Sequence, residues 1–459
     1  MRRDVCFAAA LLLAGCAAMQ AERNAQLDAR MASGAYRAAA LLAEQRLGMP
    51  SPKSDGALPP VPQDGAQVLD HLEAAQAWRL AGDPARSADH FDAAEAALKR
   101  VELESGLVEG GRQAAAVLFN DTALDYLPSP AEAVLINYYK ALDFLALARP
   151  ADARVELNRA EERIRRAVDR YSAEITAAQT QASRNGRAGA GYGDASVRAG
   201  VAANFPEMSQ WRTYRDFVVP PATYLHALFL GRSADPADQS AAAALYARLA
   251  EISDGNSAVL ADAREARAGR VCPHDDCIWI LAEQGVGPER VERRFSLPVF
   301  TYAGPLNIEL ALPALVSRDT GLTPLRAVTP DGSQGVPELA SMDRVMQTEF
   351  SKRFPAVVTR AVISSAAKAV TQYQVDRKNG PWAGVLAGIV TIATTGADLR
   401  AWRSVPGRFA LLRLTRAQAR GLRLEGARGP IEVQLPPSGA ALVHLSQPGD
   451  VPVLEILTI

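Results

Sequence analysis

The spacing of apolar residues changes once along this chain, and that change constrains the fold more than any other feature. Before about residue 265, apolar residues recur at intervals of three and four, which is typical of amphipathic helices. After Val271, short apolar runs alternate with polar residues, as in Leu306-Asn-Ile-Glu-Leu-Ala311. The sequence therefore predicts an α+β protein with an N-terminal helix and proline-rich linker over residues 16–67, a helical domain over residues 68–265 and a β-rich domain over residues 271–459.

Two helix–turn–helix units in the helical domain resemble the tetratricopeptide repeat (TPR). Small and aromatic residues occupy equivalent positions in two units that start 66 residues apart, close to twice the ~34-residue period of that repeat. These positions are Ala75, Trp78, Ser87, Phe91 and Ala94 in one unit and Ala141, Phe144, Ala153, Leu157 and Ala160 in the other.

A plain helical bundle with alanine-rich contacts explains the same pattern, because alanine is common at helix contacts. Only a TPR-like solenoid predicts a concave groove that binds a partner. The groove lining predicted from the sequence is Trp78, Tyr138, Tyr139 and His226. Each of these four side chains would also suit the interior of a bundle.

The β-rich domain is predicted to be an antiparallel, sandwich-like arrangement of seven short strands with a helical insertion at about residues 340–397. Residues 379–397 of the insertion contain no charged side chain. Three interpretations stay open for this segment: a membrane span, an interfacial or partner-facing segment, and a helix buried against the sheet.

The N-terminus has the architecture of a bacterial signal peptide, with two arginines before a short apolar run. The run ends in Leu13-Ala14-Gly15-Cys16, which resembles the lipobox of bacterial lipoproteins. The resemblance implies that residues 1–15 are removed and that Cys16 receives a diacylglycerol, which anchors a protein because each buried methylene contributes ~0.8 kcal/mol. Ala17, in place of aspartate, implies delivery to the periplasmic face of the outer membrane. The alternative is an ordinary secretory signal cut near Ala17-Ala18, which would leave a soluble mature protein.

Two further cysteines, Cys272 and Cys277, follow in the mature chain. Because they are five positions apart in a protein expected in an oxidising compartment, a local disulfide is predicted. The alternative is a metal site that uses both thiolates with His274 and Asp275. The other histidines lack the spacing that would complete a zinc site, so we expect neither metal nor cofactor.

Three segments resemble landmarks of an uncharacterised family of proteobacterial lipoproteins: residues 138–147, 224–229 and 398–406. Members of that family are commonly encoded beside lipoproteins similar to the penicillin-binding-protein activator and the curli secretion protein. The resemblance therefore implies a role in an envelope assembly. No catalytic residues are established for the family, so none are carried over. Leu399 departs from the family pattern, in which a small polar residue is expected.

Charge and motif content favour a binding protein over an enzyme. A formal net charge of −1 provides no field that would attract nucleic acid. The sequence contains no HExxH, GxSxG or P-loop motif, and no GxGxxG after a predicted strand. We therefore expect a lipid-anchored scaffold or adaptor that binds envelope proteins, including other lipoproteins. The alternative is a hydrolase of the cell wall or of a polysaccharide, for which a deep pocket with converging carboxylates would be the sign.

Overall fold

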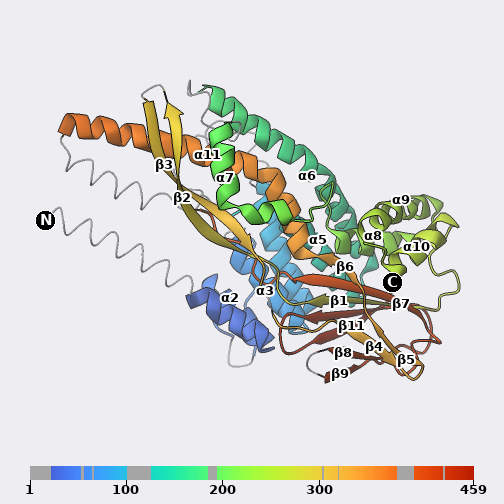
Figure 1. Cartoon of the computed structure of the whole chain (residues 1–459). Coiled ribbons are helices and arrows are strands. Elements are labelled where there is room, and N and C mark those ends of the chain that lie inside the picture. The colour runs from blue at the N-terminus through green and yellow to red at the C-terminus, as the bar shows by residue number, and fades with distance from the viewer. Residues whose placement is uncertain are drawn as a thin grey trace.

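The computed structural model describes residues 22–52, 56–64, 67–100, 126–184, 194–301, 304–318, 320–379, 397–426 and 429–459. Helices occupy most of the first part of the chain, and strands dominate after residue 276 (Figure 1). The predicted α+β class is therefore confirmed. Cys16 and residues 1–15 lie outside the described residues, as do residues 380–396 of the uncharged segment.

Four of the described helices, α5 (Pro130–Ala146), α7 (Ala195–Asn204), α9 (Pro236–Ile252) and α10 (Ser257–Arg267), begin at a capping residue that the sequence contains. At α5, the Ser129 hydroxyl accepts the N–H of Glu132, and the Glu132 carboxylate accepts the N–H of Ser129. The other helices are α2 (Tyr36–Arg46), α3 (Val68–Leu80), α6 (Pro150–Arg184), the 3-10 helix η2 (Pro206–Gln210), α8 (Pro220–Gly231) and α11 (Met342–Asn379). Residues 22–32 and 84–100 are also helical.

A five-stranded sheet forms the centre of the molecule, in the order β11-β10-β1-β7-β6. Its strands are β1 (Cys277–Gln284), β6 (Glu338–Ser341), β7 (Arg408–Thr415), β10 (Ala441–Gln447) and β11 (Val453–Leu457). The predicted antiparallel arrangement is wrong at one pair, because β1 and β10 are parallel. The chain leaves this sheet after β7, on one side of β1, and returns as β10 on the other side of β1. A hairpin can join only antiparallel neighbours, so the parallel pair of β1 and β10 requires such a crossover.

Two smaller sheets complete the β structure. A four-stranded antiparallel sheet has the order β5-β4-β8-β9, with β4 (Arg326–Thr329), β5 (Gly332–Gly335), β8 (Arg423–Gly426) and β9 (Gly429–Glu432). The remaining sheet is one long hairpin of β2 (Glu289–Thr301) and β3 (Gly304–Val316). Each strand of the four-stranded sheet is four residues long, which is too short to give a recognisable alternating pattern.

Alternation along the central strands separates two layers of core. In β1, Ile278, Ile280 and Ala282 pack against the four-stranded sheet. Trp279 and Leu281 face the helices and belong to the largest apolar core, which also contains buried residues of α3, α5, α8 and α10. The predicted boundary near residue 271 therefore separates helix from strand along the chain, but one core joins the two segments.

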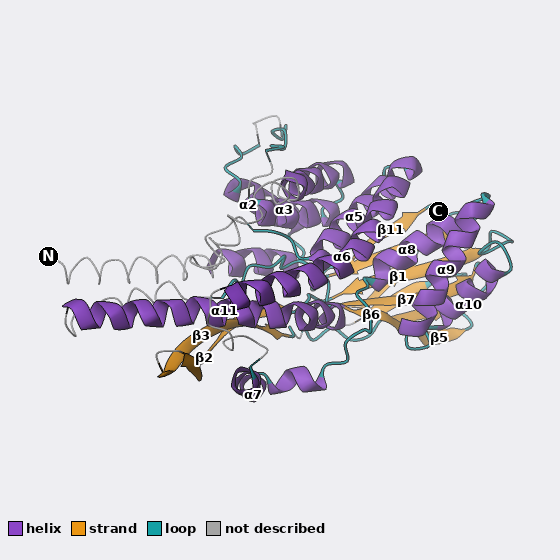
Figure 2. Cartoon of the chain, turned by 90° about the horizontal axis from the view of Figure 1, so that it is seen from above, coloured by secondary structure: helices purple, strands orange, loops and turns teal. Residues whose placement is uncertain are grey.

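The β2–β3 hairpin, α7 and α11 share a further apolar core, which includes Val201, Leu310 and Phe354. The hairpin and the far end of α11 extend beyond the rest of the molecule (Figures 1 and 2). Helix α11 continues through Pro355, although proline inside a helix removes a backbone hydrogen bond. Within the described part of the chain, no helix combines the length and the apolarity that crossing a membrane requires.

Candidate functional site

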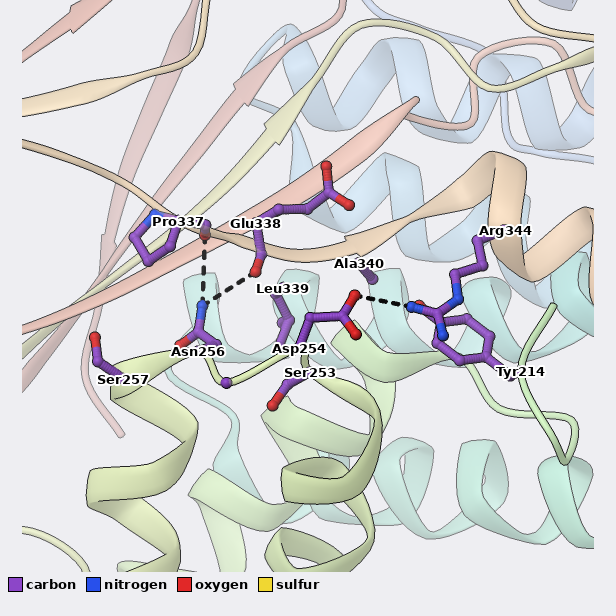
Figure 3. A pocket seen from close by; sticks show the side chains of 11 residues that line it. Tyr214, Ser253, Asp254, Asn256, Ser257, Pro337, Glu338, Leu339, Ala340 and Arg344 are labelled. Carbon is purple, nitrogen blue, oxygen red and sulfur yellow. Dashed lines mark hydrogen bonds and ion pairs between the residues drawn. The ribbon is translucent and has the colours of Figure 1, made fainter. Parts of the chain in front are cut away.

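A hollow of about 360 Å³ lies beside β6, at the edge of the central sheet (Figure 3). One wall is the turn between α9 and α10, and the opposite side is formed by the β6 segment and the start of α11. We call this space the edge hollow. Its lining residues are Tyr214, Ser253, Asp254, Gly255, Asn256, Ser257, Pro337, Glu338, Leu339, Ala340 and Arg344.

The α9–α10 turn is fixed against the sheet by Asn256. Asp254 and Gly255 adopt left-handed backbone conformations, with φ of 49° and 81°, so the chain reverses within two residues. The Asn256 side-chain oxygen then accepts the N–H groups of Ala258 and Val259 and caps α10. Its amide nitrogen donates to the carbonyl oxygen of Glu338 at 3.2 Å. One side chain therefore joins a helix start to the edge strand.

Arg344, in the first turn of α11, supplies the positive charge of the edge hollow. Its guanidinium carbon lies 4.0 Å from the centre of the Tyr214 ring, and burial raises the pKa of Tyr214 to about 12. Its Nη1 pairs with Asp254 Oδ2 at 3.0 Å, and the Asp254 side chain is 73% exposed. Its Nε is buried and has no hydrogen-bond acceptor. The Tyr214 ring therefore packs against the Arg344 guanidinium, while the Asp254 carboxylate is exposed to solvent.

The groove predicted from Trp78, Tyr138, Tyr139 and His226 is not a surface in this structure. The first three side chains have no exposed area, and His226 is 5% exposed. The prediction is wrong because the central sheet covers the face of α5 that carries Tyr138 and Tyr139, and α2 covers Trp78. His226 lies beside Asn158 instead, with 3.1 Å between its Nε2 and the amide oxygen.

Tyr138 and Tyr139 take part in a buried polar cluster between α5 and the central sheet. Glu283 of β1 is its centre, and four groups surround its two carboxylate oxygens. The hydroxyls of Tyr138 and Tyr139 donate at 2.9 and 3.2 Å, the Ser446 hydroxyl donates at 3.2 Å, and His444 Nε2 lies at 3.0 Å. Burial, followed by the Glu283 charge, raises the pKa of both tyrosines well above the ordinary value.

Arg79 of α3 extends this cluster to β11. Its guanidinium donates to Glu455 Oε2 at 2.9 Å and to Ser446 Oγ at 3.2 Å, and lies 3.1 Å from His444 Nδ1. Burial lowers the pKa of His444, but the Glu283 and Glu455 carboxylates together outweigh burial, and the net direction of the pKa shift is upward. We call Arg79, Tyr138, Tyr139, Glu283, His444, Ser446 and Glu455 the closed network.

Cys272 and Cys277 form a disulfide, so that prediction is confirmed. The two sulfurs lie near Asp276 in a group of potential metal ligands, but sulfurs bonded to each other are not thiolate ligands. Asp275, which the metal alternative counted as a ligand, forms an ion pair with Arg232. The structure therefore favours the disulfide between Cys272 and Cys277 over a metal site.

Sequence reasoning missed the residues of the edge hollow. Gly255-Asn256-Ser257 is a recognisable turn and helix-start signal, which could have located the α9–α10 wall. No local pattern marks Arg344, because its contacts with Tyr214 and Asp254 come from distant parts of the chain.

Comparisons of the chain with protein-family models, with curated proteins and with solved structures found no match.

Proposed function

We propose that this protein is a lipid-anchored adaptor on the periplasmic face of the outer membrane, attached through Cys16, and that it binds other envelope proteins rather than catalysing a reaction. The observation that carries the proposal is the sequence Leu13-Ala14-Gly15-Cys16 at the end of an apolar run. The disulfide between Cys272 and Cys277 supports export, because such bonds persist in oxidising compartments.

The proposal includes a TPR-like helical region and a sandwich-like β region. Support for the first comes from burial, because all ten residues aligned on the repeat pattern are buried: Ala75, Trp78, Ser87, Phe91, Ala94, Ala141, Phe144, Ala153, Leu157 and Ala160. Support for the second comes from the apolar core between the central and four-stranded sheets. Neither the TPR-like region nor the sandwich-like region requires an exposed groove lined by Trp78, Tyr138 and Tyr139, which are buried. We therefore propose that partners bind to other surfaces of the protein.

Membrane attachment is tested by Cys16→Ala in the native host. We expect the variant to leave the membrane fraction, because loss of the acyl chains removes the hydrocarbon that holds the protein. Cys6→Ala is the matched control: it changes a cysteine within the apolar run and is expected to preserve membrane retention. Equal retention of Cys16→Ala and the parent, together with an unmodified mature N-terminus by mass spectrometry, would rule out the anchor.

A further inference from the structure

We propose that two copies of this protein associate through β11, the outer strand of the central sheet, and that their sheets join edge to edge in an antiparallel pair with two-fold symmetry. Self-association goes beyond the proposed adaptor function. Two observations carry it: the two edges of the central sheet are covered unequally, and the pattern of residues in β11 is symmetric about its centre.

The edges of the central sheet lie on opposite sides of the molecule, at β6 and at β11 (Figure 2). At the β6 edge, Leu339 and Ala340 are each 2% exposed. The Asn256 amide donates to the carbonyl oxygens of Pro337 and Glu338 at the same edge. The chain itself therefore closes this side of the sheet. At the other side, β10 is the only described strand that pairs with β11.

The residues of β11 are partly exposed, although both faces of the strand are packed. Leu454 and Ile456 contact the core between the central and four-stranded sheets, and Leu457 belongs to the core under the helices. Every residue of the neighbouring β10 is buried, whereas the first four residues of β11 are half-buried. Because both faces are covered, the remaining exposure lies along the outer edge, where an edge strand presents unpaired N–H and C=O groups.

The strand β11 lacks the features that usually keep edge strands from pairing. Such strands are commonly protected by proline, by lysine or another outward charge, or by a covering segment. The sequence Val453-Leu-Glu-Ile-Leu457 contains no proline, lysine or arginine. Its one charged side chain, Glu455, is 19% exposed and pairs with Arg79 in the closed network. The charge within β11 is therefore already paired when a second strand approaches.

The residue pattern of β11 fits a second copy of itself in the opposite direction. In an antiparallel pair centred on Glu455, Leu454 lies beside Ile456 of the second copy, and Val453 lies beside its Leu457. Apolar side chains therefore meet on both faces of the joined sheet. The two Glu455 side chains also meet, but each carboxylate is paired with Arg79 of its own chain. Two-fold pairing uses both free edges at once, so the assembly closes at two copies.

The contact is expected to be small, because β11 is five residues long. Stable interfaces usually bury roughly 1,200–2,000 Å² in total, and we expect this pairing to bury less. The association is therefore weak in dilute detergent solution. It is favoured on a membrane, where anchored copies are held at a high local concentration. This last step rests on the proposed attachment through Cys16.

Cysteine crosslinking in isolated membranes of the native host tests the pairing. With Cys16 lipidated and Cys272 bonded to Cys277, an introduced cysteine is the only free thiol of the mature chain. Leu454→Cys and Ile456→Cys are produced separately and together, and the membranes are oxidised with copper phenanthroline. We expect roughly threefold more crosslinked dimer from the mixed sample than from either variant alone, because directly opposite Cβ atoms are closer than diagonal ones.

Energy transfer between labelled copies tests the same edge without a crosslink. Donor and acceptor dyes are attached to Ser333→Cys, on the exposed strand β5, and the lipidated chains are placed in phosphatidylethanolamine and phosphatidylglycerol vesicles. We expect transfer above the level of randomly distributed labels, and a fall to that level in Leu454→Lys, because a charge in an edge strand opposes pairing. Leu399→Lys is the matched control, the same substitution at a leucine that is 40% exposed and outside β11, and should leave transfer unchanged.

Three results would overturn the proposal: no crosslinked dimer, equal crosslinking in the mixed and single samples, or equal energy transfer in Leu454→Lys and the parent. The crosslinking result does not depend on whether the lysine variant folds. A chain without the lipid anchor would be missing from the membranes before oxidation, so loss of the anchor is distinguishable from loss of pairing.

Discussion

The closed network and the edge hollow use the same kinds of side chain in opposite circumstances. In the closed network, Arg79 is buried among Glu455, Ser446 and His444. In the edge hollow, Arg344 lies against a ring and has one carboxylate partner in solvent. Removing a partner from a buried charge costs several kcal/mol, whereas exchanging a surface partner costs little. The comparison teaches that the first arginine is fixed by several buried partners, whereas the second is held by one ring and one exposed carboxylate.

The largest expected effect is that of Glu283→Ala in the closed network. The substitution leaves two tyrosine hydroxyls, His444 and Ser446 facing an apolar gap, and it removes a charge that offsets Arg79. We expect the free energy of unfolding to fall by ~4 kcal/mol, measured by urea denaturation. The matched control is Glu338→Ala on the same sheet, where the side chain is exposed and a change within ~0.5 kcal/mol is expected. Equal losses in the two variants would remove the distinction between the two regions.

Acid is expected to lower the free energy of unfolding, because His226 is buried and its hydrogen-bond partner is the Asn158 amide rather than a carboxylate. Burial, followed by the charge of Arg154, lowers the pKa of His226 to about 4 from 6.5. The unfolded chain therefore takes up a proton between pH 6.5 and 4 that the folded chain refuses, and stability falls as pH falls through this window. The single histidine accounts for roughly 3 kcal/mol of the loss.

His226→Gln should therefore reduce the difference in unfolding free energy between pH 6.5 and pH 4.5, measured by urea denaturation at both values. The shift at His444 has the opposite direction, because the Glu283 carboxylate favours its protonated form. An unchanged pH difference in His226→Gln would show that burial without a countercharge is not what weakens the protein in acid.

Apart from the Glu338→Ala control, the smallest expected effect on stability is that of Arg344→Gln in the edge hollow. Its ion pair with Asp254 is exposed, so thermal or urea unfolding should change by less than ~1 kcal/mol. A loss comparable to that of Glu283→Ala would mean that Arg344 holds the fold together. The edge hollow would then belong with the closed network rather than stand in contrast to it.

The sequence predicts elements well where one periodicity is long enough to be read. Leu306, Ile308 and Leu310 alternate with polar neighbours, and the strand that this alternation predicts lies within β3. The parallel pairing of β1 with β10 could not be predicted, because the partner of a strand depends on where the chain re-enters the sheet. Trp78 and Tyr138 show a related limit: their spacing predicts close helix packing, but not that α2 covers the first side chain and the central sheet covers the second. Arg344 is harder still, because its carboxylate partner lies 90 residues earlier.

The bond between Arg79 and Glu455 joins residues that are 376 positions apart in the sequence. The cost of closing so long a loop must be met before that contact stabilises anything, and contacts of this kind slow folding. When the chain emerges from its N-terminus onward, Arg79 of α3 emerges long before Glu283 of β1 and Glu455 of β11. Until β1, β10 and β11 have all emerged, Arg79 lacks the carboxylates that surround it in the folded protein. During that interval the helices lack the sheet that later covers them, and they depend on the surrounding compartment to keep them from aggregating.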